Sequence, residues 1–129
     1  MSIRILLVDD ETDFLETMAK RFTIRKMPVA TATSGQEALR LIEEQEFDVV
    51  VLDVRMPGMD GLELLRQIRT KRPLTEVIML TGHASLETGM QGMKLGAYDY
   101  ILKPADFDEL LDKVRKADER RQLNAKTAR

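Results

Sequence analysis

The sequence predicts an α/β domain in which a parallel β-sheet of five strands carries helices on both faces. Five short apolar runs alternate along the chain with segments of helical periodicity, which is the order typical of that class. The first, third and fourth runs are continuously apolar, as strands are when a parallel sheet buries both of their sides. The expected strands are residues 3–8, 28–32, 49–52, 77–80 and 98–102.

Helices are expected between these strands and after the last one, because apolar residues there recur at helical spacing. The four clear stripes are Leu15, Met18, Ala19 and Phe22; Ala38, Leu39, Leu41 and Ile42; Leu64, Leu65 and Ile68; and Phe107, Leu110, Leu111 and Val114. Residues 85–95 form the weakest predicted helix, since Gly89 and Gly92 lower its propensity. The helix start signals are Ser34 with Glu37, a capping box, and its acidic analogues Asp60 with Glu63 and Asp106 with Glu109.

The composition excludes several classes of function. The 129 residues fit one domain, and the lack of cysteine excludes disulfides, thiolate zinc sites and cysteine nucleophiles. The single histidine, His83, argues against a histidine-rich metal site. A net charge of −2 is not the footprint of a dedicated nucleic-acid binder. No run approaches the roughly 20 apolar residues of a membrane span, so we expect a cytoplasmic protein without membrane contact.

The charge is distributed unevenly between the body of the chain and its end. Residues 118–129 contain four basic and two acidic residues, a charge of +2, which leaves −4 for residues 1–117 of a chain at −2. We therefore expect one domain over residues 1–117. Residues 118–129 are expected to be a charged tail that extends the last helix, either as a solvated end or as the stub of a linker.

Polar residues follow four of the five predicted strands at the point where each ends. They are Asp9 and Asp10 after the first, Asp53 after the third, Thr81 after the fourth, and Lys103 followed by Pro104 after the fifth. Taken singly, each has an ordinary explanation as a helix N-terminal acid, a turn residue or a solvated loop residue. Ligands of open parallel sheets, however, bind outside the carboxyl ends of the strands. The coincidence of these residues at equivalent strand ends therefore favours a functional site.

The chemistry of these side chains points to a hard cation and to phosphoryl transfer. Two like charges ~4 Å apart cost about 4 kcal/mol at an effective dielectric constant near 20, so three clustered carboxylates attract a cation. Oxygen ligands without nearby histidine or cysteine suit Mg²⁺, with Mn²⁺ as a second candidate. A carboxylate beside Mg²⁺ and a lysine can accept a phosphoryl group and become an aspartyl phosphate.

The ordered set of motifs resembles the receiver domain of two-component response regulators over residues 3 to about 117. The motifs are Val8-Asp9-Asp10-Glu11, Leu52-Asp53-Val54-Arg55-Met56-Pro57-Gly58-Met59-Asp60-Gly61, Thr81-Gly82, Tyr100 and Lys103-Pro104. The resemblance implies the flavodoxin-like (βα)5 fold of the chemotaxis receiver, with strand order 2-1-3-4-5. It also implies that Asp53 accepts a phosphoryl group from a sensor histidine kinase or a histidine phosphotransfer protein.

The same resemblance implies a role for each site residue. Asp9, Asp10, Asp53 and the backbone carbonyl of Arg55 would hold Mg²⁺, and Lys103 would pair first with Asp53 and then with the phosphoryl oxygens. The expected switch residues are Thr81, whose hydroxyl would move to the phosphoryl group; Tyr100, which would turn into the vacated space; and Pro104, which follows a cis peptide bond in this family. Arg55 and His83 would tune the phosphoryl lifetime, either by shielding the acyl phosphate or by orienting water.

The resemblance implies a signalling domain that catalyses only its own phosphorylation and slow dephosphorylation, not an enzyme with an external substrate. The output partner or output domain stays unknown. The face of the fourth helix, fifth strand and fifth helix is the expected homodimer surface. One alternative is a receiver that acts by protein contact without phosphorylation. An aspartyl-phosphate phosphatase is less favoured, because Arg55 stands where dehalogenase-like phosphatases have a second aspartate.

Overall fold

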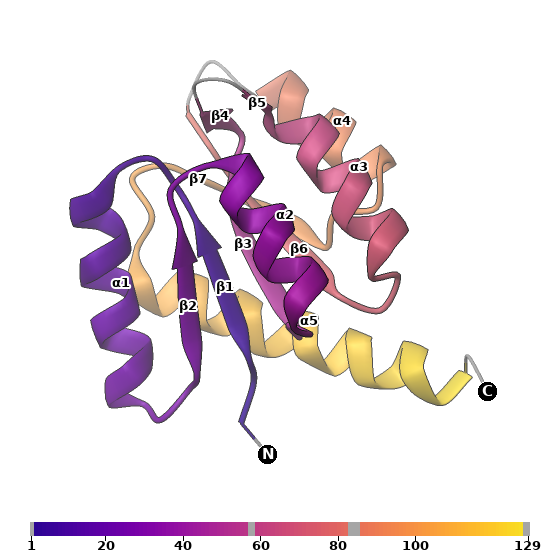
Figure 1. Cartoon of the computed structure of the whole chain (residues 1–129), viewed down its shortest axis with the longest axis horizontal. Helices are drawn as coiled ribbons and strands as arrows, with labels where there is room; N and C mark the ends of the chain where they lie inside the picture. The colour runs from indigo at the N-terminus through magenta and orange to yellow at the C-terminus, as the bar shows by residue number, and fades with distance from the viewer. Residues whose placement is uncertain (1, 57–58, 83–85, 128–129) are drawn as a thin grey trace.

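The computed structural model describes residues 2–56, 59–82 and 86–127, and Figure 1 shows a sheet with helices on both faces. The elements in chain order are β1 (Ile5–Val8), α1 (Thr12–Ile24), β2 (Val29–Ala32), α2 (Gly35–Glu44), β3 (Val49–Asp53), β4 (Arg55–Met56), β5 (Met59–Asp60), α3 (Gly61–Lys71), β6 (Glu76–Thr81), α4 (Leu86–Lys94), β7 (Asp99–Leu102) and α5 (Phe107–Thr127). All five predicted strands are present with ends within two residues of those predicted, each of the four apolar stripes lies in a helix, and α4 covers most of residues 85–95. No helix within these described residues is both long and apolar enough to span a membrane.

The main sheet has five parallel strands in the order β2-β1-β3-β6-β7. Counted among the five predicted strands, this is the order 2-1-3-4-5, so the fold prediction is confirmed. Every residue of β1, β3 and β6 is buried, whereas β2 and β7 at the edges are partly exposed. The three continuously apolar runs are therefore the central strands. The short antiparallel ribbon of β4 and β5 was not predicted.

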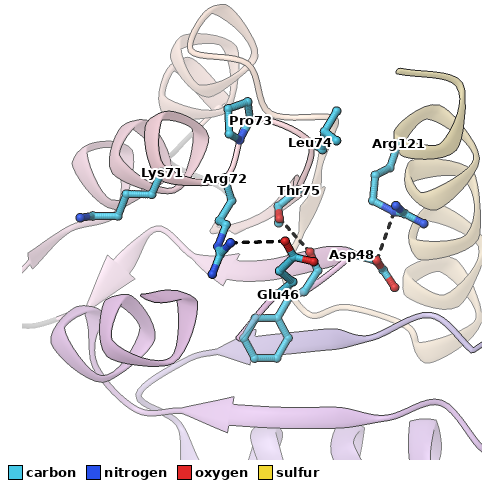
Figure 2. Close-up of a pocket in the computed structure, with 9 residues that line it drawn as sticks. Glu46, Asp48, Lys71, Arg72, Pro73, Leu74, Thr75 and Arg121 are labelled. Carbon is cyan, nitrogen blue, oxygen red and sulfur yellow. Dashed lines mark hydrogen bonds and ion pairs between the residues drawn. The ribbon is translucent and has the colours of Figure 1, made fainter. Parts of the chain in front are cut away.

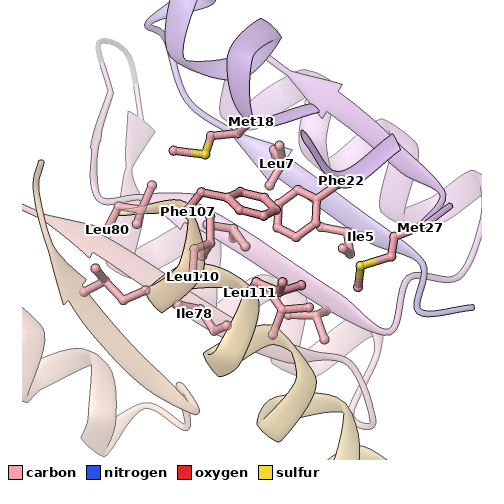
Figure 3. Close-up of a cluster of buried hydrophobic side chains, with 14 of the residues drawn as sticks. Ile5, Leu7, Met18, Phe22, Met27, Ile78, Leu80, Phe107, Leu110 and Leu111 are labelled. Atoms are coloured by element: carbon pink, nitrogen blue, oxygen red, sulfur yellow. The ribbon is translucent and has the colours of Figure 1, made fainter. Parts of the chain in front are cut away.

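Alternate residues of the central strands feed two separate hydrophobic cores. Ile5 and Leu7 face the core beneath α1 and α5 (Figure 3), whereas Leu6 and Val8 face the core beneath α2 and α3. In the first core the rings of Phe22 and Phe107 meet edge to face, with centroids 4.9 Å apart. Burial on both faces fixes the register of each strand, since a slip of one residue would exchange the two cores.

The two glycines that lower the predicted helical propensity of α4 lie where this helix packs closely against the sheet. A Cβ atom on Gly92 would lie 2.2 Å from the Sδ atom of Met79, and one on Gly89 would lie 3.2 Å from the ring of Tyr100. Glycine thus lets α4 approach β6 and β7 closely, and this packing offsets the lower helical propensity of the segment.

Two of the three predicted helix start signals form side-chain caps, and at the third a backbone hydrogen bond is seen. The Ser34 hydroxyl accepts a hydrogen bond from the Glu37 amide at 3.1 Å, and a carboxylate oxygen of Asp60 accepts one from the Leu62 amide at 2.9 Å, so both residues cap their helices. At the start of α5, the backbone carbonyl of Asp106 accepts a hydrogen bond from the Leu110 amide at 3.0 Å.

The segment from residue 118 onward continues α5 and its first turn is anchored to the sheet. Asp118 is buried, and the Arg120 guanidinium donates to both carboxylate oxygens of Glu76, at 2.5 and 2.7 Å. The same guanidinium lies 4.7 Å from the centre of the Tyr98 ring. Residues 118–121 therefore pack against the domain, and a domain boundary at residue 117 stays a prediction.

Candidate functional site

Three aspartates gather at the carboxyl end of the sheet. One carboxylate oxygen from each of Asp9, Asp10 and Asp53 lies within 4.8 Å of the other two. The parallel pairing of Val8 with Leu52 brings the ends of β1 and β3 to the same edge, and the aspartates follow directly. Asp9 and Asp53 are 1% and 5% exposed, whereas Asp10 is exposed to solvent. The structure thus brings the three predicted metal ligands together.

Both buried aspartates are oriented by the backbone that follows them. An oxygen of Asp9 accepts a hydrogen bond from the Glu11 amide at 2.9 Å, and an oxygen of Asp53 accepts one from the Arg55 amide at 3.1 Å. This i to i+2 bond is the Asx-turn that aspartate readily forms. It uses Oδ1 of each residue and leaves Oδ2 of each facing Lys103.

Lys103 is the cation that contacts this cluster. Its ammonium donates to Asp9 at 2.9 Å, to Glu11 at 2.8 Å and to Asp53 at 3.4 Å, and it lies 5.2 Å from the centre of the Phe14 ring. The predicted pairing of Lys103 with Asp53 is present, but it is the longest of the three contacts. The sequence reasoning missed the contact with Glu11, whose only sequence signal is its place directly after Asp10.

The electrostatics of the cluster favour an additional cation. Burial raises the pKa of Asp9, and the neighbouring charge of Asp53 adds to this, against the lowering effect of the hydrogen bonds from the Glu11 amide and Lys103. Burial acts to lower the pKa of Lys103, but its hydrogen bonds to Glu11 and Asp9 outweigh it, so that the pKa is raised overall. The Lys103 ammonium lowers the pKa of the Glu11 carboxyl. Lys103 thus contacts three carboxylates, and a fourth, that of Asp10, lies beside Asp9 and Asp53; this oxygen-rich, net negative site suits Mg²⁺.

Thr81 ends β6 beside the acidic cluster. It is 1% exposed, and its hydroxyl oxygen has no hydrogen-bond partner among the residues that the structure describes. Its backbone carbonyl accepts a hydrogen bond from the Lys103 amide at 2.7 Å, and the Leu80 carbonyl accepts one from the Val54 amide at 3.2 Å. These bonds hold the ends of β3, β6 and β7 side by side.

The remaining predicted residues lie around this centre. Tyr100 of β7 is half-buried with its ring close to Gly89 of α4, and Arg55 is exposed. The Lys103–Pro104 peptide bond is cis, as the resemblance implies. His83 lies outside the described residues, so its prediction is not tested.

Two cavities lie at opposite ends of the sheet. One of 360 Å³ lies at the mouth of the acidic cluster and is lined by Glu11, Phe14, Lys103, Pro104 and Ala105. The other, of 210 Å³, lies at the amino ends of β3 and β6, where ion pairs join Arg72 to Glu46 and Arg121 to Asp48 (Figure 2). Of these two cavities, the first adjoins the acidic cluster.

Comparison with known proteins identifies the family. The family model of the response regulator receiver domain matches residues 5–115. The chain belongs to this family. The receiver domain is the signalling domain of two-component systems, and receiver domains bind Mg²⁺ at an acidic pocket such as the one formed here by three aspartates.

Individual relatives agree with this assignment. The chain is 39% identical to the regulatory protein AtoC of Escherichia coli over 107 residues, which are 83% of the chain and 23% of AtoC. It is 40% identical to the transcriptional regulatory protein ZraR of the same organism over 116 residues, 90% of the chain and 26% of ZraR. The receiver domain thus spans about a quarter of the length of these curated relatives.

Solved structures share the fold over nearly the whole receiver domain. A CheY-like receiver domain protein from Methanospirillum hungatei is 33% identical with a TM-score of 0.90, covering 96% of this chain and 99% of its own. NtrX from Brucella abortus is also 33% identical with a TM-score of 0.93, covering 99% of this chain and 30% of its own.

Proposed function

We propose that this receiver domain accepts a phosphoryl group on Asp53 from a sensor histidine kinase or a histidine phosphotransfer protein, with Mg²⁺ as cofactor. The observation that carries the proposal is the arrangement around Asp53. One carboxylate oxygen is held by the Arg55 amide, the other faces Lys103 at 3.4 Å, and Asp9 and Asp10 lie within 4.8 Å. Asp53 is thus a candidate nucleophile with the Lys103 ammonium and two further carboxylates, which could bind a metal ion, close by.

The proposed reaction transfers a phosphoryl group from a nitrogen or oxygen atom of the donor to a carboxylate oxygen of Asp53. An oxygen of Asp53 attacks the phosphorus atom, the bond between phosphorus and the donor breaks, and the donor keeps that electron pair. Bound Mg²⁺ would neutralise the phosphoryl oxygens, and Asp9, Asp10, Asp53 and the Arg55 carbonyl are the residues to hold it. Lys103 donates to a phosphoryl oxygen and stabilises the charge that collects there.

The switch proposed for this domain uses Thr81 and Tyr100. The Thr81 hydroxyl has no partner among the described residues, so a phosphoryl oxygen on Asp53 would give this buried donor its hydrogen bond. Tyr100 then turns into the space that Thr81 leaves. Such a two-state element, biased by a local charge, is the general form of a phosphorylation switch. Arg55 and His83 are proposed to set the phosphoryl lifetime.

The proposed output lies outside this domain. Its relatives include proteins named as transcriptional regulators that are about four times as long, so we propose an output domain or output partner that reads the switch. The receiver domain itself is not expected to bind nucleic acid or a membrane, and its proposed location is the cytoplasm. Exposed Met90 and Leu102 on the α4–β7–α5 face support that face as a homodimer surface. A receiver that signals by contact alone remains the alternative, which the following experiment separates.

The test is phosphorylation of the full chain by acetyl phosphate and Mg²⁺, followed by intact mass. We expect one added phosphoryl group on the wild type, none on Asp53→Asn and none when a chelator removes the metal. Asp108→Asn, a change of the same chemistry at an exposed position of α5, serves as the matched control and should be labelled like the wild type. Equal labelling of Asp53→Asn would overturn the assignment of Asp53, and an unlabelled wild type would favour the contact-only alternative.

A further inference from the structure

Glu11 makes the shortest contact with Lys103 in the site. The distance from the lysine nitrogen to the Glu11 carboxylate is 2.8 Å, whereas that to Asp53 is 3.4 Å. An ammonium group has three donors, and here Asp9, Glu11 and Asp53 take all three. The lysine that must serve the phosphoryl group is therefore held toward the rim of the site.

We propose that Glu11 is a positioning residue that competes with the incoming phosphoryl group for the Lys103 ammonium and so slows the phosphorylation of Asp53. This inference rests on the proposed function and adds Glu11 to the residues that control the rate of phosphorylation. Glu11 acts through Lys103 and makes no contact with Asp53 in the structure.

Neighbouring residues hold both Glu11 and Lys103 in place for their contact. Its amide donates to Asp9, which itself holds Lys103, so the two acids that draw the lysine to the rim belong to one turn. The Phe14 ring lies 5.2 Å from the lysine nitrogen on the same wall of the cavity. The Glu11 side chain is 64% exposed, so water can solvate its carboxylate when the lysine leaves.

Transfer of a phosphoryl group to Asp53 requires this arrangement to change. The ammonium must move toward the oxygens that gain charge in the transition state, and the charge-assisted hydrogen bond to Glu11 opposes that movement. Removing the Glu11 charge therefore removes an interaction that stabilises the resting site and has to break before Lys103 reaches the phosphoryl group. The Glu11 carboxylate also lines the cavity beside Lys103. Its charge would repel an anionic donor that entered there, and this second effect has the same sign.

The experiment measures the rate of phosphorylation of the full chain by acetyl phosphate at saturating Mg²⁺, by intact mass. We expect Glu11→Gln and Glu11→Ala to react about threefold faster than the wild type, the effect of one largely exposed ion pair on a rate. The Glu11 side chain makes no capping bond at the start of α1, so neither change should prevent folding. Circular dichroism of each variant checks this.

Two controls separate competition for Lys103 from simple charge repulsion. Glu16→Gln removes an exposed negative charge from the same helix without touching Lys103, and it should react at the wild-type rate. Glu11→Asp keeps the charge but shortens the reach, so it should react faster than the wild type. In the unphosphorylated protein, the Cε resonance of Lys103 should move in Glu11→Gln but not in Glu16→Gln, which ties the change in rate to the loss of the Glu11 contact; a merely structural role would slow the reaction or leave it unchanged, and would not accelerate it.

The outcomes are distinguishable from a failure of the proposed function. A wild type that is labelled on Asp53 at the same rate as Glu11→Gln overturns this inference and leaves the proposed function intact. Equal acceleration by Glu16→Gln also overturns it, because charge alone would then suffice. A wild type that takes up no phosphoryl group overturns the proposed function, and this inference with it.

Discussion

The two ends of the sheet both bury carboxylates, but they differ in how those charges are balanced. At the amino end, Glu76 is fully buried and is met by Arg120 at 2.5 Å and by Arg69 at 3.8 Å. At the carboxyl end, the buried pair Asp9 and Asp53 shares a single lysine with Glu11, and the Asp10 carboxylate lies beside the pair. The first arrangement has a surplus of cations and the second a surplus of anions.

This difference separates structural charges from functional ones. A buried acid with two guanidinium partners is satisfied within the fold and has no need of a ligand. A cluster of acids with one ammonium keeps a net negative charge that a bound cation would balance, and here it lies beside a cavity. The comparison therefore assigns the amino end to stability and the carboxyl end to function, and variants at both ends test this division.

The largest effect is expected at the amino end, from Arg120→Met. The change leaves the Glu76 carboxylate fully buried with only the 3.8 Å contact to Arg69, and breaking a buried pair in this way costs about 3 kcal/mol. Urea unfolding at pH 7 measures it. Lys116→Met, which removes the exposed pair with Asp112, is the matched control and should change the free energy of unfolding by at most about 0.5 kcal/mol. A loss in Arg120→Met no larger than in this control would show that Glu76 needs no partner.

The second effect is expected from Lys103→Met at the carboxyl end. Without metal, removal of the lysine that contacts Asp9, Glu11 and Asp53 should lower the free energy of unfolding by about 2 kcal/mol. Because the pKa of Lys103 is raised, the lysine is protonated in both the folded and the unfolded state below its ordinary value of 10.5. Its contribution is lost only as the pH rises above that value, so the deficit should be the same at pH 6 and pH 9.

Magnesium distinguishes the two ends further. Free Mg²⁺ at ten times its dissociation constant stabilises a site by about 1.4 kcal/mol. A divalent cation can replace the missing ammonium, so at a given Mg²⁺ concentration Lys103→Met should gain more stability than the wild type. Arg120→Met should gain only the wild-type increment. Equal gains in both variants would contradict the assignment of the cation deficit to the carboxyl end.

The strands and the three aspartates could be predicted from sequence for one physical reason. Parallel pairing brings the carboxyl ends of all strands to one edge, so a residue directly after a strand is placed by topology alone. Asp9 and Asp53 needed no knowledge of side-chain conformation, because each follows or ends a buried apolar run. The same reasoning located Thr81 and Lys103 at the ends of their strands.

Contacts that depend on side-chain reach or on close packing could not be predicted. The bond between Lys103 and Glu11 joins residues 92 positions apart, and no periodic pattern specifies it. Sequence alone predicts Arg120 to lie in a charged tail, either a solvated end or a linker stub, because its partner Glu76 precedes an apolar run and carries no signal of burial. Gly89 and Gly92 lowered the helix prediction because propensity does not include the approach of α4 to the sheet.

The smallest effect is expected from Asp9→Asn, and it has the opposite sign. Burial raises the pKa of Asp9, so the folded state binds this proton more tightly than the unfolded state, and ionisation at neutral pH opposes folding. Asp9→Asn should therefore be more stable than the wild type at pH 7 without metal, by about 1 kcal/mol, the usual gain when strain at a functional site is relieved.

The pH dependence tests the cause of that gain. The wild type recovers stability as the pH falls through the raised pKa of Asp9 toward the ordinary value of 3.8, so the advantage of Asp9→Asn should shrink over this range. Saturating Mg²⁺ should reverse the order at pH 7, because the wild type keeps a carboxylate that the variant lacks. A variant that stayed more stable in Mg²⁺ would show that Asp9 is buried for the fold, as Glu76 is, and the two ends of the sheet would no longer differ in kind.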